Sequence, residues 1–243
     1  MSRNPRLLVL VSGAALAFAT ASVPALATDT NAADHLISHA HNASYSSNWS
    51  GYAETGSGFT SAKATWTVPS VSATSTSTYS SAWVGIDGDG NSNLIQTGTE
   101  SDYVNGHAEY SAWWEILPAY SVTISGMTIS PGDSITASVA KSSGTKWVIS
   151  LTDDTTGKSW SATKTYSGAG QSAEYVQEAP TVGGSQAAVA HFSTFSFSGL
   201  TVNGANPGLV SSEKIILRQN NVDYSTPSDP NSAGNGFSVS YTG

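Results

Sequence analysis

The chain has 243 residues, no cysteine, and a formal net charge of −8 from 17 acidic residues against 9 lysines and arginines. The absence of cysteine excludes a fold held by disulfides, and the absence of a basic stripe argues against nucleic acid as a partner. The length is enough for one domain with a sizeable hydrophobic core.

Residues 1–27 are typical of a secretory signal peptide. Two arginines precede an apolar run over residues 7 to about 19, and the small residues Ala25 and Ala27 follow at a plausible cleavage site. The apolar run is shorter than the roughly 20 residues of a membrane-spanning helix. We therefore expect a secreted, extracellular protein that has no membrane partner once the signal is removed.

Residues 28–47 are polar and have no apolar periodicity, which predicts a propeptide or flexible leader. The leader contains His35, His39 and His41, but their spacing matches no zinc pattern. We expect no catalytic metal and no cofactor. The remaining residues, 48–243, are expected to form a single domain.

This domain is predicted to be all-β. Short alternating runs rich in Thr, Ser, Val, Tyr and Trp are separated by clusters of Gly, Asn, Asp and Pro. Residues 70–81 and 225–235 are expected to be exposed loops. The expected strands cover residues 62–68, 80–86, 108–117, 134–140, 146–152, 189–197 and 214–218.

Several chemically useful side chains fall on matching faces of these strands. Because successive side chains of a strand face opposite ways, Trp83 and Asp87 share one face. Trp113 and Glu115 share a face of another strand, and Gln96 lies on a third. Two indoles on a solvated face would form an exposed apolar patch, which is typical of a binding surface. The alternative is that these are ordinary side chains of a half-solvated antiparallel sheet.

Six segments together resemble one family, the glutamic peptidases, also called eqolisins or peptidase family G1. Their order and spacing along the chain are similar to those of the family, and the resemblance fades after about Phe197. It implies an antiparallel β-sandwich of two packed, curved sheets, of the concanavalin-like or jelly-roll type, with a concave substrate cleft. The absence of cysteine differs from fungal members and suggests a bacterial member without disulfides. The segments are residues 48–51, 83–88, 94–98, 110–115, 126–135 and 173–178.

The resemblance implies that Gln96 and Glu178 form the catalytic dyad of a secreted endopeptidase. Peptide hydrolysis needs a base to activate water, donors for the oxyanion and an acid for the leaving amine. Glu178 can act as base and then as acid, whereas Gln96 can orient the water and donate an N–H. A neutral amide beside a carboxylate adds no like-charge repulsion, so the base can ionise in mildly acidic solution.

The same resemblance implies that five further side chains line the cleft and bind an extended polypeptide substrate. Their types allow both stacking and hydrogen bonding. We expect polypeptides to be the only partners and the protein to be a monomer. The five residues are Trp49, Trp83, Asp87, Trp113 and Glu115.

Two other classes of function stay open at this stage. A β-sandwich glycoside hydrolase could use Glu115 and Glu178, about 5 Å apart in a retaining enzyme. A non-catalytic carbohydrate-binding module would show no turnover. A serine or cysteine triad finds no support, because cysteine and the G-x-S-x-G motif are absent, and His107 and His191 are expected to be structural.

A calcium loop over residues 87–98 is also considered. Asp87, Asp89, Asn91 and Asn93 have the spacing of calcium ligands, but the later positions of an EF-hand loop lack the required Gly and Glu. A turn rich in Gly, Asn and Asp is favoured.

Overall fold

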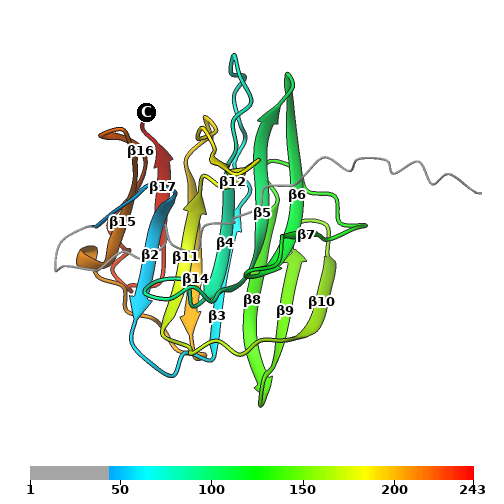
Figure 1. Ribbon diagram of the computed structural model, residues 1–243, viewed down its shortest axis with the longest axis vertical. Coiled ribbons are helices and arrows are strands. Elements are labelled where there is room, and N and C mark those ends of the chain that lie inside the picture. The colour runs from blue at the N-terminus through cyan, green and yellow to red at the C-terminus, as the bar shows by residue number, and fades with distance from the viewer. Residues whose placement is uncertain (1–43) are drawn as a thin grey trace, which may run out of the picture.

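The computed structural model describes residues 44–243, which are almost entirely β-sheet (Figure 1). The predicted signal peptide and residues 28–43 of the predicted leader lie outside the described residues. The single helical segment in the described part is a 3-10 turn, η2 (Ser211–Glu213). The strands are β1 (Ser44–Ser46), β2 (Trp49–Thr55), β3 (Ser61–Thr67), β4 (Ser81–Ile86), β5 (Ile95–Val104), β6 (His107–Ile116), β7 (Val122–Thr123), β8 (Ser134–Ser143), β9 (Lys146–Asp153), β10 (Lys158–Thr165), β11 (Ser172–Glu178), β12 (Thr181–Val182), β13 (Ser185–Gln186), β14 (Phe195–Val202), β15 (Lys214–Gln219), β16 (Val222–Pro227) and β17 (Phe237–Tyr241).

β12 and β13 form a separate two-stranded sheet, and the other strands form one long sheet in the order β10-β9-β8-β3-β14-β17-β16-β15-β2-β11-β4-β5-β6-β7. Neighbours in this order are antiparallel, and β1 adds a short parallel pairing with β15. The sheet folds on itself so that β3 and β8 lie against β4 and β5, as Figure 1 shows. This confirms the predicted antiparallel β-sandwich.

The main core fills the space between the two halves of the sandwich. On β9 the buried side chains Trp147, Ile149 and Leu151 alternate with partly exposed ones, as expected for a strand with one face on the core. β4 differs because all six of its residues are buried. Its inner face, with Val84 and Ile86, joins the core, and its outer face carries Trp83 into a second apolar cluster. That second cluster lies under the candidate site.

Gly98 leaves room for two tryptophans on this outer face. The sheet register places it between Trp83 on β4 and Trp113 on β6. A Cβ at this position would lie 2.6 Å from the Cβ of Trp83. Glycine in the middle of β5 therefore lets the two indoles flank the strand.

Three boundaries differ from the sequence predictions. The predicted strand 189–197 is wrong in its first part, because β14 begins at Phe195 and the preceding residues form only isolated bridges. The predicted loop 225–235 is wrong at its start, because its first three residues belong to β16 and Ser225 is fully buried. Residues 44–46, expected in the leader, pair with β15. In each case pairing with a distant strand decides the local structure.

The described part of the chain contains no helix of the length and apolar character needed to cross a membrane.

Candidate active site

Three adjacent strands bring the two predicted catalytic side chains to one face of the sheet. Glu178 on β11 is the register partner of Ser81 on β4, and Ser81 is the partner of Glu100 on β5. Gln96 lies four residues from Glu100 on the same strand, so the period of two places both side chains on the same face. The alternation used for Gln96 in the sequence therefore identifies the correct side of β5.

A small cavity joins these side chains. Its volume is about 20 Å³, close to the space that one water molecule needs. Both Gln96 and Glu178 line it, although they are 82 residues apart in the chain (178 minus 96). The complete lining is Ser81, Gln96, Glu100, Trp113, Glu115, Ser121, Glu178 and Pro180.

The carboxylate of Glu178 is fixed by donors from two other parts of the chain. The indole Nε1 of Trp83 donates to Oε2 at 2.7 Å. The side-chain Nδ2 of Asn48 donates to Oε1 at 3.1 Å. Hydrogen bonds to an ionised carboxylate are stronger than neutral ones and favour the charged form. The two contacts hold this carboxylate in one orientation at the edge of the cavity.

The amide of Gln96 is oriented by Glu115. These residues are register partners on β5 and β6, and Nε2 of Gln96 donates to Oε2 of Glu115 at 2.6 Å. A carboxamide nitrogen carries two N–H groups, so one N–H is left after this bond. Oε1 of Gln96 has no hydrogen-bond partner among residues 44–243. The amide therefore has both a donor and an acceptor for a water or a substrate.

The three predicted cleft tryptophans are buried rather than exposed. Trp49, Trp83 and Trp113 have exposed fractions of 2%, 0% and 5%, so the expected exposed apolar patch is wrong. Trp49 and Trp83 pack edge to face, with ring centroids 5.1 Å apart and an interplanar angle of 75°, a favoured geometry for aromatic pairs. Of the three, only Trp113 lines the cavity. The indoles form an apolar base beneath the polar site.

Asp87 is not brought to this cavity. β4 ends at Ile86, and Asp87 adopts a left-handed conformation with φ of 69°, so the strand alternation does not reach it. Its buried carboxylate accepts hydrogen bonds from the Tyr166 hydroxyl at 2.7 Å and from the backbone N–H groups of Gly170 and Gln171 at 3.0 and 2.8 Å. Asp87 ties the β4–β5 loop to the segment that precedes β11.

The possible calcium loop is a hydrogen-bonded turn in this structure. Nδ2 of Asn91 donates to Asp87 at 3.0 Å, and Oδ1 of Asn91 accepts from the backbone N–H of Asn93 at 2.9 Å. These contacts agree with the prediction of a turn rich in Gly, Asn and Asp. Within residues 44–243 no group of three or more His, Asp or Glu side chains is placed to hold a metal ion.

Burial makes a second carboxyl at the cavity hard to ionise. Burial raises the pKa of Glu100, with Glu109 adding to the rise and a hydrogen bond from Ser111 at 2.8 Å opposing it. Burial also raises the pKa of Asp102, two residues further along β5, well above its usual range, and Glu100 adds to this. Burial therefore disfavours the charged form of both groups, which reduces the negative charge that they add near Glu178.

Sequence reasoning did not assign five residues of the site. Asn48 belongs to a segment of the family resemblance and directly precedes Trp49, but its hydrogen bond to Glu178 is seen only in the structure. Ser81 and Glu100 could have been found from the period of two, because Ser81 shares a face of β4 with Trp83 and Glu100 shares a face of β5 with Gln96. Ser121 and Pro180 lie between strands and have no periodic signal.

Comparison with known proteins identifies the family. A model described as the Peptidase A4 family matches residues 47–241. The chain belongs to this family. The family comprises the eqolisins, or glutamic peptidases, and the protein is therefore a glutamic peptidase. The match continues well beyond Phe197, so the sequence-based limit of the resemblance was wrong.

Named relatives and solved structures agree with this family assignment. Aspergillopepsin-2 of Aspergillus niger is 34% identical over 231 residues, which cover 82% of this chain and 79% of that protein. Scytalidopepsin B of Scytalidium lignicola is 43% identical over 121 residues, 49% of this chain and 45% of that protein. The crystal structure of scytalido-glutamic peptidase with a transition state analog inhibitor has a TM-score of 0.69 and 32% identity, covering 81% of this chain and 98% of that one.

Proposed function

We propose that this glutamic peptidase is a secreted, acid-acting endopeptidase in which Glu178 and Gln96 activate water for attack on a peptide bond. The observation that carries the proposal is that both side chains line one cavity with room for about one water molecule. Secretion is supported by the signal-like residues 1–27.

The chemistry needs only the groups at this cavity. Glu178 takes a proton from the water as the water oxygen attacks the carbonyl carbon of the substrate. The second N–H of Gln96 donates to the oxyanion that forms. Glu178 then passes its proton to the amine nitrogen, the C–N bond breaks, and a carboxylic acid and an amine leave. Each step conserves protons without a further reactant.

Three neighbours act as positioning residues in this scheme. Trp83 and Asn48 hold the Glu178 carboxylate, and Glu115 holds the Gln96 amide. Precise orientation of this kind is a large part of catalysis, because a base and a donor must meet the reacting atoms at near-contact distance. Trp113 supplies an apolar wall next to them. Substrate contacts by Trp49 and Asp87 stay predictions.

Action in acid is supported by the charges around the site. Gln96 is neutral at any working pH. Burial raises the pKa of Glu100 and of Asp102, which disfavours the charged form of each. These two groups therefore add less like-charge repulsion at the cavity than exposed carboxylates would, and the third carboxyl there, Glu115, accepts a hydrogen bond from Gln96.

The glycoside hydrolase and the carbohydrate-binding module are not supported. The family is a peptidase family, and Glu115 is engaged with Gln96 rather than left as a partner for Glu178. The test is hydrolysis of casein and of xylan by the purified protein between about pH 3 and 5. We expect casein to be cleaved internally and xylan to stay intact. An inert protein, or one that cleaves xylan alone, would overturn the proposal.

A further inference from the structure

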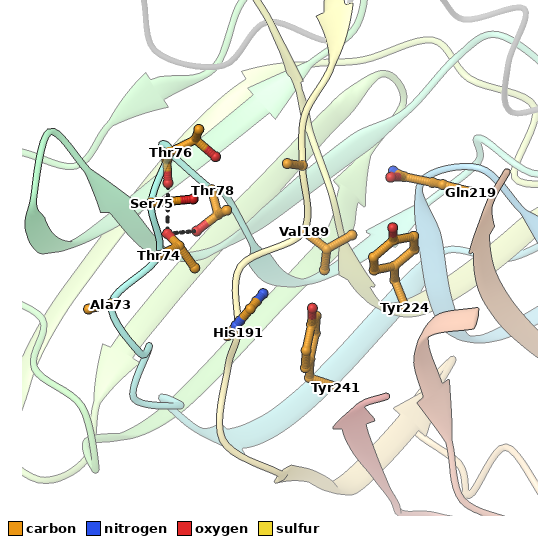
Figure 2. A pocket seen from close by; sticks show the side chains of 11 residues that line it. Ala73, Thr74, Ser75, Thr76, Thr78, Val189, His191, Gln219, Tyr224 and Tyr241 are labelled. Atoms are coloured by element: carbon orange, nitrogen blue, oxygen red, sulfur yellow. Dashed lines mark hydrogen bonds between the residues drawn. The ribbon is translucent and has the colours of Figure 1, made fainter. Parts of the chain in front are cut away.

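A second and much larger pocket lies away from the candidate active site. Its volume is about 400 Å³, within the range of pockets that bind small ligands. Figure 2 shows Tyr224 and Tyr241 on one side, the loop over residues 73–78 on the other, and His191 between them. We call it the tyrosine pocket.

The walls of the tyrosine pocket combine aromatic, hydroxyl and small apolar side chains. None of the described residues that line it is Asp, Glu, Lys or Arg. The rings of His191 and Tyr241 pack against each other, with centroids 4.4 Å apart and an interplanar angle of 30°. Methyl groups of Val189 and Ala188 complete that side. An aromatic side chain can enter without taking a carboxylate, a lysine or an arginine out of water.

Several polar groups of the walls are already bonded within the protein. Oγ1 of Thr74 donates to the carbonyl oxygen of Thr76 at 2.7 Å and lies 3.2 Å from Oγ1 of Thr78. Nε2 of Gln219 donates to the carbonyl oxygens of Ser47 and Ala187 at 3.0 and 3.3 Å. These contacts reduce the number of side chains that could satisfy the many hydroxyls of a sugar ring.

A few polar atoms are left for a ligand. Among residues 44–243, no hydrogen bond engages the hydroxyls of Tyr224 and Tyr241 or the imidazole of His191. Backbone N–H and C=O groups need partners when they leave water. Aromatic walls with a few unbonded polar atoms therefore suit a peptide segment that carries an aromatic side chain.

The tyrosine pocket and the cleavage cavity share two chain segments. Thr78 lines the pocket, and Ser81, three residues later, lines the cavity. On the second segment the N–H of Ala187 donates to the carbonyl oxygen of Pro180 at 3.0 Å. Pro180 lines the cavity and Ala188 lines the pocket. An extended chain covers about 3.3 Å per residue, so Thr78 and Ser81 are at most ~10 Å apart along the backbone, a span that a few residues of substrate can cover.

We propose that the tyrosine pocket is a second docking site for the polypeptide substrate, which takes an uncharged segment with an aromatic side chain outside the cleavage cavity. This inference rests on the proposed endopeptidase function. It predicts that long, unfolded substrates are preferred over short peptides, because only a long chain can occupy both sites.

The first test fills the pocket. Ala188→Trp places an indole in it at an exposed position, and Ala233→Trp is the matched control, because Ala233 is exposed in the loop at the other end of β16 and β17. We expect Ala188→Trp to lower the ratio of kcat/KM on casein to kcat/KM on a blocked hexapeptide about tenfold, which corresponds to about 1.4 kcal/mol. The control should keep the wild-type ratio.

The second test observes binding without turnover. In the Glu178→Gln variant, the imidazole proton NMR signals of His191 should shift when the blocked tetrapeptide acetyl-Ala-Phe-Tyr-Ala-amide is added. The double variant Glu178→Gln/Ala188→Trp should show no such shift. Three outcomes would overturn the docking site. The ratio of kcat/KM values could stay unchanged in folded Ala188→Trp, or the His191 signals could fail to shift when the peptide is added. The same signals could also shift when xylotriose is added in place of the peptide. A wild-type protein that cleaves neither substrate would overturn the proposed function, while the titration would still report on the pocket.

Discussion

Two glutamates on β11 differ sharply although they share one strand and one face. Glu178 receives hydrogen bonds from Trp83 and Asn48 and borders a water-sized cavity. Glu174, four residues earlier, is completely buried between Ala53 and Gly85 of the neighbouring strands. Burial raises the pKa of Glu174 well above its usual range, and Asp89 and Asp87 add to the rise. Burial and nearby carboxylates disfavour the charged form of Glu174, whereas hydrogen-bond donors and space for water suit Glu178 to its proposed role as a base.

The largest expected effect separates these two glutamates directly. Glu178→Gln should lower kcat/KM on casein by ~10²- to 10⁴-fold in acid, because the general base is lost. Glu174→Gln should keep activity close to that of the wild type, because a neutral carboxyl is replaced by a neutral amide of the same shape. Assays at one acid pH, with circular dichroism to verify folding, check both. Equal losses in the two folded variants would contradict the distinction.

The next effect concerns the amide partner of the base. Gln96→Ala should lower kcat/KM by ~10²- to 10³-fold, the usual cost of one oxyanion donor. Gln171→Ala is the matched control, because Gln171 is exposed outside the cavity. The loss should fall mainly on kcat, since the donor acts in the transition state. A variant that changes only KM would show that Gln96 binds substrate without stabilising the oxyanion.

A smaller effect tests the donors that distinguish Glu178 from Glu174. Trp83→Phe removes the indole N–H, and a hydrogen bond to a charged group is worth about 1.5–3 kcal/mol. We expect kcat to fall about 10- to 100-fold and the acidic limb of the pH–rate profile to move to higher pH, because the charged form loses a donor. Trp160→Phe, on β10, is the control. A uniform loss with an unmoved profile would indicate a purely structural role for Trp83.

The smallest effect is on stability and follows from carboxyl groups that are buried or half-buried in the folded protein. Burial raises the pKa of Glu54 to about 7 and those of Glu174, Glu100 and Asp102 above their usual range. Unfolded acids ionise near about 4, so between the two values the folded state holds more protons. The free energy of unfolding therefore decreases as pH rises through this window.

Thermal melts at several pH values check whether stability falls as pH rises. The Tm should be highest in mild acid and should fall between about pH 5 and 8. Glu174→Gln should flatten that fall, because its amide has no proton to lose. A wild-type Tm that rises over the same range would show that other groups control the stability.

Part of the site could be read from the strand alternation. Gln96 and Glu115 were placed on one face by a period of two, and the structure pairs them across β5 and β6. The same rule failed for Asp87, because the strand ends one residue earlier and the backbone turns left-handed. It also misjudged the exposure of Trp83 and Trp113, because alternation gives the side of a sheet but not what covers that side.

The sequence by itself determined the all-β class, the strands with clear alternation, and the family, because these depend on local patterns and on short segments in a fixed order. The tertiary structure alone decided that Trp83 and Asn48 meet Glu178, that Asp87 supports a loop, and that a second, larger pocket forms away from the candidate active site. Each of these depends on contacts between segments far apart in the chain, and no local pattern specifies which distant strands become neighbours.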